Sequence, residues 1–376
     1  MNKKNFKLLA SLAMFGASVL WAQEFEFSFT NELSSDIVTI DNIWEDETNF
    51  AGITENASVE FSSEKVDAYL EVEFTLGTGK GNDVGSETNH LNFAWTDLDY
   101  WLHFRPFKIL TLAFHDDLWM DGSYLPLWDD NALAGGLGSS GFTLMVELIE
   151  GLRIAATIPM DILDEEFANF LNGDEDEGEH KPFDLGFGAE YAFGELFSVG
   201  AKVGDLIDSD EIYFGVFAAI RPLKSDDLII RAGYGHYEGE NGILEELDYS
   251  ENIALAGKNI FNASVEWAMN DFALAAEIVC DTDFDDEYED EDSDKNKAYD
   301  MYIGVKFGYA ITENFMVGLG GQCFLDFGEA NAKPVFGVEP SVGCAFGNHE
   351  FSLAADLEFC DGDIFVKFPI SWTYSF

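Results

Sequence analysis

Apolar and polar residues alternate along most of this chain with a period of two. The clearest stretches are 66–76, 299–309 and 351–359, where every second residue is apolar. Because successive side chains of a β-strand point to opposite faces, this period predicts strands with one apolar face. Beyond the first 22 residues, no run reaches the ~18 apolar residues that a transmembrane helix needs. The pattern therefore predicts a chain built from strands.

The pattern predicts an all-β fold of eighteen strands, joined alternately by short turns and long loops. The tight hairpins include 150–151, 194–195, 269–271 and 347–349, and the long connections include 34–53, 117–140, 160–182, 238–259 and 281–297. An even strand number lets the first strand pair with the last, which closes an antiparallel barrel. Sixteen strands is the nearest alternative. The predicted strands span residues 24–33, 54–63, 66–77, 90–105, 108–116, 141–149, 152–159, 183–193, 196–205, 211–221, 228–237, 260–268, 271–280, 298–309, 314–324, 334–345, 350–360 and 363–376.

The last predicted strand separates its two faces most sharply. One face is apolar throughout and carries Ile364, Val366, Phe368, Ile370, Trp372, Tyr374 and Phe376. An apolar outer face and a polar inner face suit a barrel set in a membrane. The strand resembles the C-terminal β-signal of bacterial outer-membrane proteins, with Trp372, Tyr374 and Phe376 as the matching aromatic residues. The resemblance implies a transmembrane barrel of the porin group in outer-membrane lipid, with short periplasmic turns, long extracellular loops and recognition by the barrel-assembly machinery.

The first residues have the layout of a secretory signal peptide. Lys3, Lys4 and Lys7 precede an almost wholly apolar run from Leu8 to Ala22. We expect cleavage after Ala22, so that residues 1–22 are the signal peptide and residues 23–376 form a single barrel domain.

The composition narrows the choice of partners. The net charge is −53 at pH 7, so the chain is not expected to bind nucleic acid through its phosphates. Aromatic residues make up 15% of the chain and Phe is the commonest of them. This content is typical of the aromatic girdles at the two edges of a membrane barrel.

Strand phase places an excess of acids on the polar, inward face of the barrel. Carboxylates that line a water-filled channel attract cations, although any single residue can equally belong to a solvated or internally paired wall. We expect Glu71, Glu73, Asp97, Asp99, Glu147, Glu190, Arg231 and Lys306 to line the pore. The other inward acids are Glu60, Asp67, Glu266, Glu277, Glu339, Asp356 and Glu358, and the other inward bases are Arg153, Lys202 and Lys367.

The third long connection, residues 116–141, combines acids with aromatic residues. In general porins the third extracellular loop folds into the channel and forms its constriction, and this segment resembles that loop in position and length only. A loop packed over the barrel mouth is the alternative. The candidate constriction residues are Asp116, Asp117, Trp119, Asp121, Trp128, Asp129 and Asp130.

Two other loops, 172–179 and 281–294, are runs of acids. Like charges repel, so such runs are usually solvated. Asp281, Asp283 and Asp285 have the spacing of a calcium loop, but Asp286 stands where that loop needs glycine. We expect no specific metal site or cofactor, and at most loose binding of divalent cations.

The sequence contains no motif of a hydrolase or a metalloprotease. Three functions remain. The first is a porin-like channel for passive passage of small hydrophilic solutes, with a preference for cations. The second is a surface-exposed adhesin or interaction barrel that uses its long acidic loops. The third is a transporter of hydrophobic compounds, for which the N-terminal segment is too short to be a plug. Porins are often trimers, and the oligomeric state stays open.

Overall fold

The computed structural model describes residues 26–42, 47–49, 53–79, 90–116, 118, 120–127, 130–131, 137, 139–158, 185–207, 212–237, 248–250, 253–254, 258–282, 299–327 and 333–376. The predicted signal peptide, the acidic run 172–179 and all but the first two residues of the run 281–294 lie outside these ranges.

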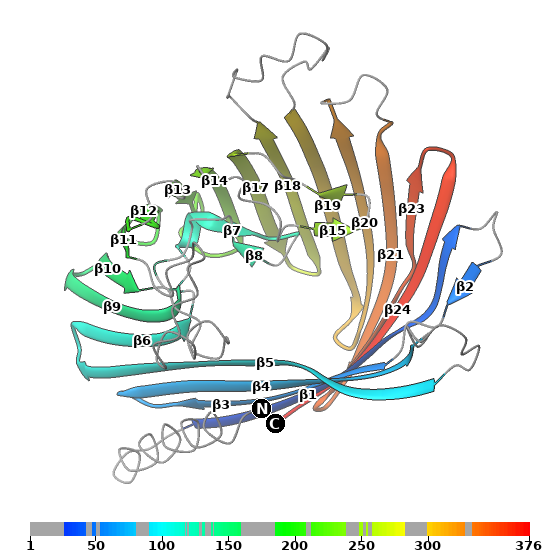
Figure 1. Ribbon diagram of the computed structural model, residues 1–376, viewed down its shortest axis with the longest axis horizontal. Helices are drawn as coiled ribbons and strands as arrows, with labels where there is room; N and C mark the ends of the chain where they lie inside the picture. The colour runs from blue at the N-terminus through cyan, green and yellow to red at the C-terminus, as the bar shows by residue number, and fades with distance from the viewer. Residues whose placement is uncertain are drawn as a thin grey trace, which may run out of the picture.

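Eighteen strands within the described ranges close into one antiparallel barrel (Figure 1). Each strand pairs with the next barrel strand in the chain, and β1 pairs with β24 to complete the ring. The barrel strands are β1 (Glu26–Asn42), β3 (Ile53–Ser62), β4 (Val66–Gly79), β5 (His90–Phe107), β6 (Leu110–Asp116), β9 (Ser139–Ile149), β10 (Leu152–Ile158), β11 (Gly186–Phe193), β12 (Phe197–Gly204), β13 (Tyr213–Ile220), β14 (Leu228–Tyr237), β17 (Asn259–Met269), β18 (Phe272–Thr282), β19 (Tyr299–Thr312), β20 (Phe315–Asp326), β21 (Val335–Phe346), β22 (His349–Ala354) continued by β23 (Asp356–Cys360), and β24 (Asp363–Ser375). The minor elements are β2 (Glu47–Asn49), the 3-10 turn η1 (Asp121–Ser123), β7 (Tyr124–Leu125), β8 (Asp130–Asn131), β15 (Asp248–Ser250) and β16 (Ile253–Ala254).

The prediction of eighteen strands is confirmed, with two local differences. The long connection predicted at 34–53 is wrong in its first part, because β1 continues to Asn42 and pairs with β24 and β2. The strand predicted at 350–360 is interrupted at Ala355, which faces Pro340 of β21. Ala355 N donates to Pro340 O at 3.0 Å. Proline has no N–H to complete the ladder, which explains the break.

The four predicted hairpins occur as tight turns between β9 and β10, β11 and β12, β17 and β18, and β21 and β22. Gly151 and Gly347 have positive φ values of 83° and 61° in two of them. Glycine adopts this conformation without steric cost. Because neighbouring strands run in opposite directions, all four turns lie at the barrel end that also holds Glu26 and Phe376.

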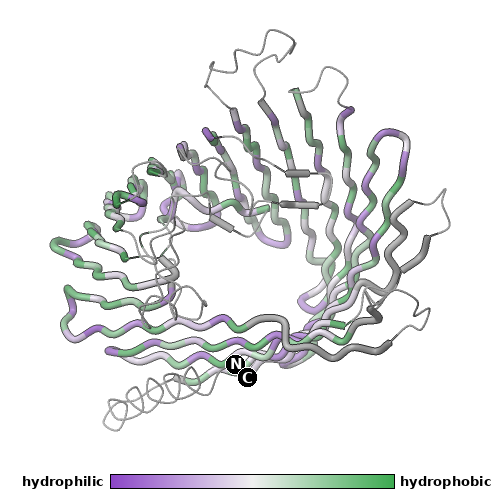
Figure 2. Tube along the Cα trace, viewed as in Figure 1, coloured by the Kyte–Doolittle hydropathy of each residue, from purple (hydrophilic) through white to green (hydrophobic). Residues whose placement is uncertain are grey.

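The two faces of the barrel wall reverse the pattern of a soluble protein. On β14, Ile230 is 42% exposed whereas the neighbouring Arg231 is 6% exposed. On β11, Phe187 is exposed and Glu190 is buried. Figure 2 shows the alternation of apolar and polar residues along the strands. Apolar side chains outside and charged side chains inside are the arrangement of a barrel in a membrane.

Among the described residues, no helix is long and apolar enough to cross a membrane.

Candidate functional site

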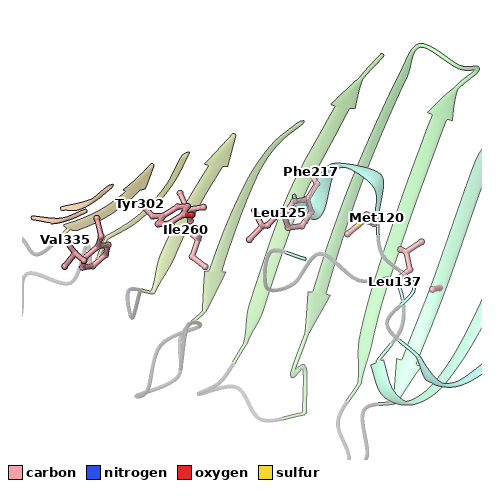
Figure 3. Packing of buried hydrophobic residues seen from close by; sticks show 10 residues of the cluster. Met120, Leu125, Leu137, Phe217, Ile260, Tyr302 and Val335 are labelled. Atoms are coloured by element: carbon pink, nitrogen blue, oxygen red, sulfur yellow. The ribbon is translucent and has the colours of Figure 1, made fainter. Parts of the chain in front are cut away.

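The connection between β6 and β9 enters the barrel and packs on its inner wall. We call residues 120–127, which include η1 and β7, the inner segment. The 3-10 turn lies against β12, β13 and β14, and Figure 1 shows β7 and β8 within the ring of strands. Met120, Leu125 and Leu137 are fully buried and belong to one cluster with Phe217 and Ile260 of the wall (Figure 3). The apolar core of the described barrel therefore lies between this connection and the wall.

Glycines in the wall make room for this packing. A Cβ atom at Gly200 would overlap the sulfur of Met120, and one at Gly188 would lie 2.7 Å from Leu137 Cδ2. On the inner segment itself, a Cβ at Gly122 would overlap the backbone of β13. Glycine within a strand often marks a close approach of another chain segment. These glycines therefore fix where the inner segment lies.

Asp121 is the polar anchor of the inner segment. Its carboxylate accepts two hydrogen bonds from Arg221, one of them 2.8 Å long from Nη2, and a third from Ser198 Oγ at 2.7 Å. Its backbone N donates to Glu190 Oε1 at 2.8 Å. Glu190 in turn forms an ion pair with Arg153. The anchor thus joins the segment to β10, β11, β12 and the turn after β13.

The partners of Asp121 keep it ionised. Burial by itself raises the pKa of this carboxyl group, but the hydrogen bonds from Arg221 and Ser198 and the charge of Arg221 outweigh burial and hold the pKa below its ordinary value of 3.8. The pKa of Arg221 is raised, first by its hydrogen bond to Asp121. Both groups are therefore charged at neutral pH.

Arg231 makes the second polar attachment. Its Nε donates to the Asp121 carbonyl oxygen at 3.0 Å, and its guanidinium group lies 5.2 Å from the centre of the Tyr124 ring. Arg231 also forms an ion pair with Glu266 of β17. Arg153, Arg221 and Arg231 thus each have a carboxylate partner.

The wall formed by β4 and β5 differs from the wall next to the inner segment, because here acids lie opposite other acids. In their ladder Glu71 faces Asp99, which places two like charges opposite each other on the lumenal face, and the backbone of Glu73 pairs with that of Asp97. Tyr69 donates to Glu71 at 2.6 Å and stacks on Trp101, with ring centres 5.9 Å apart. Directly opposed like charges are unfavourable unless water or cations screen them. Figure 1 shows β4 and β5 across the lumen from β7.

The structure brings together three of the residues expected at the pore. Glu190 and Arg231 both bind the backbone of Asp121. Glu147 faces Arg153 across the ladder between β9 and β10, and Lys306 lies 3.4 Å from Glu339. Only the backbone is described for Asp97, Asp116 and Asp130, and four expected residues lie outside the described ranges, namely Asp117, Trp119, Trp128 and Asp129.

Arg221, Ser198 and the wall glycines were not expected as site residues. Arg221 was the last residue of the predicted strand 211–221 and was not placed among the inward bases, although it shares the phase of the buried residues Phe217 and Ala219. One signal was available, since the chain has only four arginines, Arg105, Arg153, Arg221 and Arg231. A scarce arginine in a strongly acidic chain indicates a specific partner.

The C-terminal aromatic residues lie at the seam of the barrel. Phe376 N donates to Phe29 O and Phe29 N donates to Phe376 O, both at 3.0 Å. Trp372 donates from Nε1 to Nδ1 of His349 at 3.2 Å. The last residue of the chain therefore takes part in closing the ring.

No group of three or more His, Cys, Asp or Glu side chains suited to a metal ion occurs among the residues that the structure describes. Loose binding of divalent cations by the acidic runs stays a prediction.

Fold and lumen together define a large closed barrel with an apolar outer face and an inner segment in its lumen. Several solved structures share this architecture. OccAB4 of Acinetobacter baumannii is 12% identical, with 94% of this chain and 99% of that chain covered and a TM-score of 0.56. A BenF-like porin from Pseudomonas fluorescens Pf-5 is 10% identical, with 94% and 98% covered and a TM-score of 0.58. OccAB1 of Acinetobacter baumannii is 13% identical, with 94% and 96% covered and a TM-score of 0.57.

No protein-family model and no curated protein sequence matches the chain. At these identities the similarity shows the fold alone, which is an eighteen-strand closed barrel with the architecture of the BenF-like porin, in agreement with the fold that the C-terminal strand predicted.

Proposed function

We propose that the protein is a channel in the bacterial outer membrane that lets small hydrophilic solutes pass passively and prefers cations. The observation that carries this proposal is the closed barrel with a polar, charged lumen, in which an inner segment is anchored to one wall. Closed barrels of this strand number are wide enough to leave an aqueous lumen. The similarity to a protein described as a porin supports the general assignment.

The proposed cation preference rests on the unequal walls of the lumen. Next to the inner segment, Arg153, Arg221 and Arg231 are each paired with a carboxylate. Across the lumen, Glu71 and Asp99 face each other on β4 and β5, and neither forms an ion pair with another described residue. Solutes that pass between the two therefore meet net negative charge. Salt screens such charges, so the preference weakens as ionic strength rises.

The inner segment is the proposed constriction. It occupies lumenal space, and its attachments to the wall come from apolar packing, an ion pair and backbone hydrogen bonds together. Asp121 holds the segment, and the side chains of the other candidate constriction residues lie outside the part of the chain that the structure describes.

We also infer how the barrel reaches the membrane. Export through the N-terminal signal peptide and recognition of Trp372, Tyr374 and Phe376 by the barrel-assembly machinery would deliver a single barrel domain to the lipid, where its apolar outer face is covered. No feature of the described residues favours the adhesin hypothesis, which depends on acidic loops outside them.

Conductance of purified, refolded protein in a planar lipid bilayer tests the channel itself. We expect stable, stepwise openings at millimolar to molar salt, and swelling of protein-containing liposomes in small sugars. A barrel that is folded by its circular dichroism and heat-modifiable migration, yet never conducts, would overturn the proposal. The matched control is the same protein after heat denaturation, which should give no openings.

A further inference from the structure

Beneath the inner segment, β17 and β18 carry three buried polar side chains, four of whose polar atoms lack partners among the residues that the structure describes. Asn262 and Ser264 are each 5% exposed and Glu277 is 3% exposed. The four atoms are Glu277 Oε1, Ser264 Oγ and both polar atoms of the Asn262 amide, and none of them has a hydrogen-bond partner in the described part of the chain. Buried polar groups are nearly always satisfied, so several unsatisfied atoms in one place indicate a bound species.

These side chains share the lumenal face of two neighbouring strands. Ser264 lies directly opposite Glu277 in the ladder, and Asn262 is the next residue of β17 on the same face. The Asn262 amide oxygen lies over Gly233 of β14. Leu127 N closes the patch from the side of the inner segment, where it donates to Glu277 Oε2 at 3.3 Å.

The arginines near this patch are already paired with other carboxylates. Arg153, Arg221 and Arg231 are paired with Glu190, Asp121 and Glu266, respectively. Glu277 lies beside this group, and it forms no ion pair with a described residue. An ionised carboxylate at 3% exposure, with one backbone hydrogen bond, is strongly unfavourable unless a positive charge accompanies it.

We propose that one monovalent metal cation, sodium or potassium, binds between β17, β18 and the inner segment, with Glu277 Oε1 and Ser264 Oγ as ligands. Hard cations prefer oxygen donors such as carboxylate, hydroxyl and amide oxygens, and the Asn262 amide provides a further oxygen on the same face. A cation bound there provides the positive charge that a buried, ionised Glu277 requires. The ion therefore stabilises the inner segment, because Glu277 holds Leu127 through its other oxygen. This site does not depend on whether the barrel conducts.

Anomalous X-ray scattering locates such an ion directly. Crystals of the whole barrel soaked in thallium(I) nitrate, with thallium(I) as the probe for potassium, should show an anomalous peak between Glu277 and Ser264. The peak should be lost in E277Q and kept in E339Q, which removes a carboxylate of the same wall that is paired with Lys306. A wild-type crystal without a peak at this position would overturn the proposal in favour of a protonated Glu277 or a buried water molecule.

A stability measurement gives an independent answer in detergent solution. An ion that binds only the folded state raises the unfolding midpoint. Wild-type protein and E339Q should unfold at higher temperature in potassium chloride than in choline chloride of equal ionic strength, by about 2 °C. E277Q should unfold at the same temperature in both salts. Should E277Q fail to fold, S264A replaces it and should show a reduced difference. Equal midpoints for wild-type protein in the two salts would contradict a bound metal ion.

Discussion

Asp121 holds the inner segment in the lumen with groups from four neighbouring parts of the wall. Its carboxylate binds Arg221 and Ser198, its backbone N binds Glu190, and its carbonyl oxygen accepts a hydrogen bond from Arg231. A carboxylate used in this way is no longer available to attract a passing cation. At the scale of the residue, the role of an acid in this barrel is therefore decided by whether an arginine lies within reach.

The variant D121N should loosen the inner segment. Asp121 and Arg221 are each 22% exposed, so loss of the ion pair is expected to destabilise the fold by about 1–2 kcal/mol, below the cost of breaking a fully buried pair. Urea unfolding measures this loss, and single-channel traces should become noisier. The double variant D121N/R221M should recover part of the loss. A D121N protein with wild-type stability and quiet openings would show that the pair does not anchor the segment.

The same pair sets the lowest pH at which the inner segment keeps its anchor. The pKa of Asp121 is lower in the folded protein than its ordinary value of 3.8, so the stabilisation from the pair is complete above pH 3.8 and is lost as pH falls through the folded value. Between pH 8 and about pH 5 this pair should therefore contribute no change in open-channel noise. Added noise should begin only below about pH 4, and D121N should lack this acid step.

At the scale of the element, the strands could be predicted from their own residues, whereas the position of the inner segment could not. Every strand carries the period-two pattern in its own residues, so eighteen strands were predictable from the sequence alone. The position of the inner segment depends on which wall it meets, and that wall comes from residues 150 to 280, far along the chain. Gly188 and Gly200 are the residues of the wall that make this contact possible, and they are visible in the sequence. Glycine also occurs in strands at bulges and tight bends, so it does not by itself predict a packed segment.

The variant G200A tests the packing of the inner segment against β12. The added Cβ would overlap the sulfur of Met120, so the segment has to shift. We expect a lower unfolding temperature and an altered single-channel conductance. G308A is the matched control, because its Cβ would meet only Ala273 and Met316 at 3.8 and 3.9 Å, an ordinary contact distance. Equal effects of G200A and G308A would contradict the packing described for Met120.

At the scale of the whole molecule, β1 and β24 close the barrel, and Phe376 extends their pairing to the end of the strand. Two backbone hydrogen bonds join Phe376 to Phe29, and the aromatic ring of Phe376 lies 5.5 Å from that of Phe29. The terminal strand thus combines the sequence pattern of an assembly signal with a position at the seam. The alternating pattern of the strands was enough to predict the architecture of the molecule. The difference in charge between the two lumenal walls could not be predicted, because it depends on which carboxylate each arginine pairs with.

Deletion of Phe376 should impair assembly of the barrel in cells. The seam loses two backbone hydrogen bonds and an aromatic contact, and the proposed signal loses its terminal aromatic residue. The amount of heat-modifiable protein in outer-membrane fractions measures the effect. F376Y keeps the ring and the backbone and should assemble at wild-type levels. Normal outer-membrane levels of the deletion variant would show that Phe376 is needed neither for closing the seam nor as part of the assembly signal.

The central claim is that cations pass along an acidic wall on the side of the lumen opposite the inner segment. The reversal potential of the channel in a potassium chloride gradient across a planar bilayer tests it most directly. We predict a potential of the sign that indicates potassium permeating faster than chloride, reduced in E71Q/D99N and unchanged in E195Q/E313Q, which removes two exposed carboxylates at the short turns. A wild-type potential of zero or of the opposite sign would contradict the account.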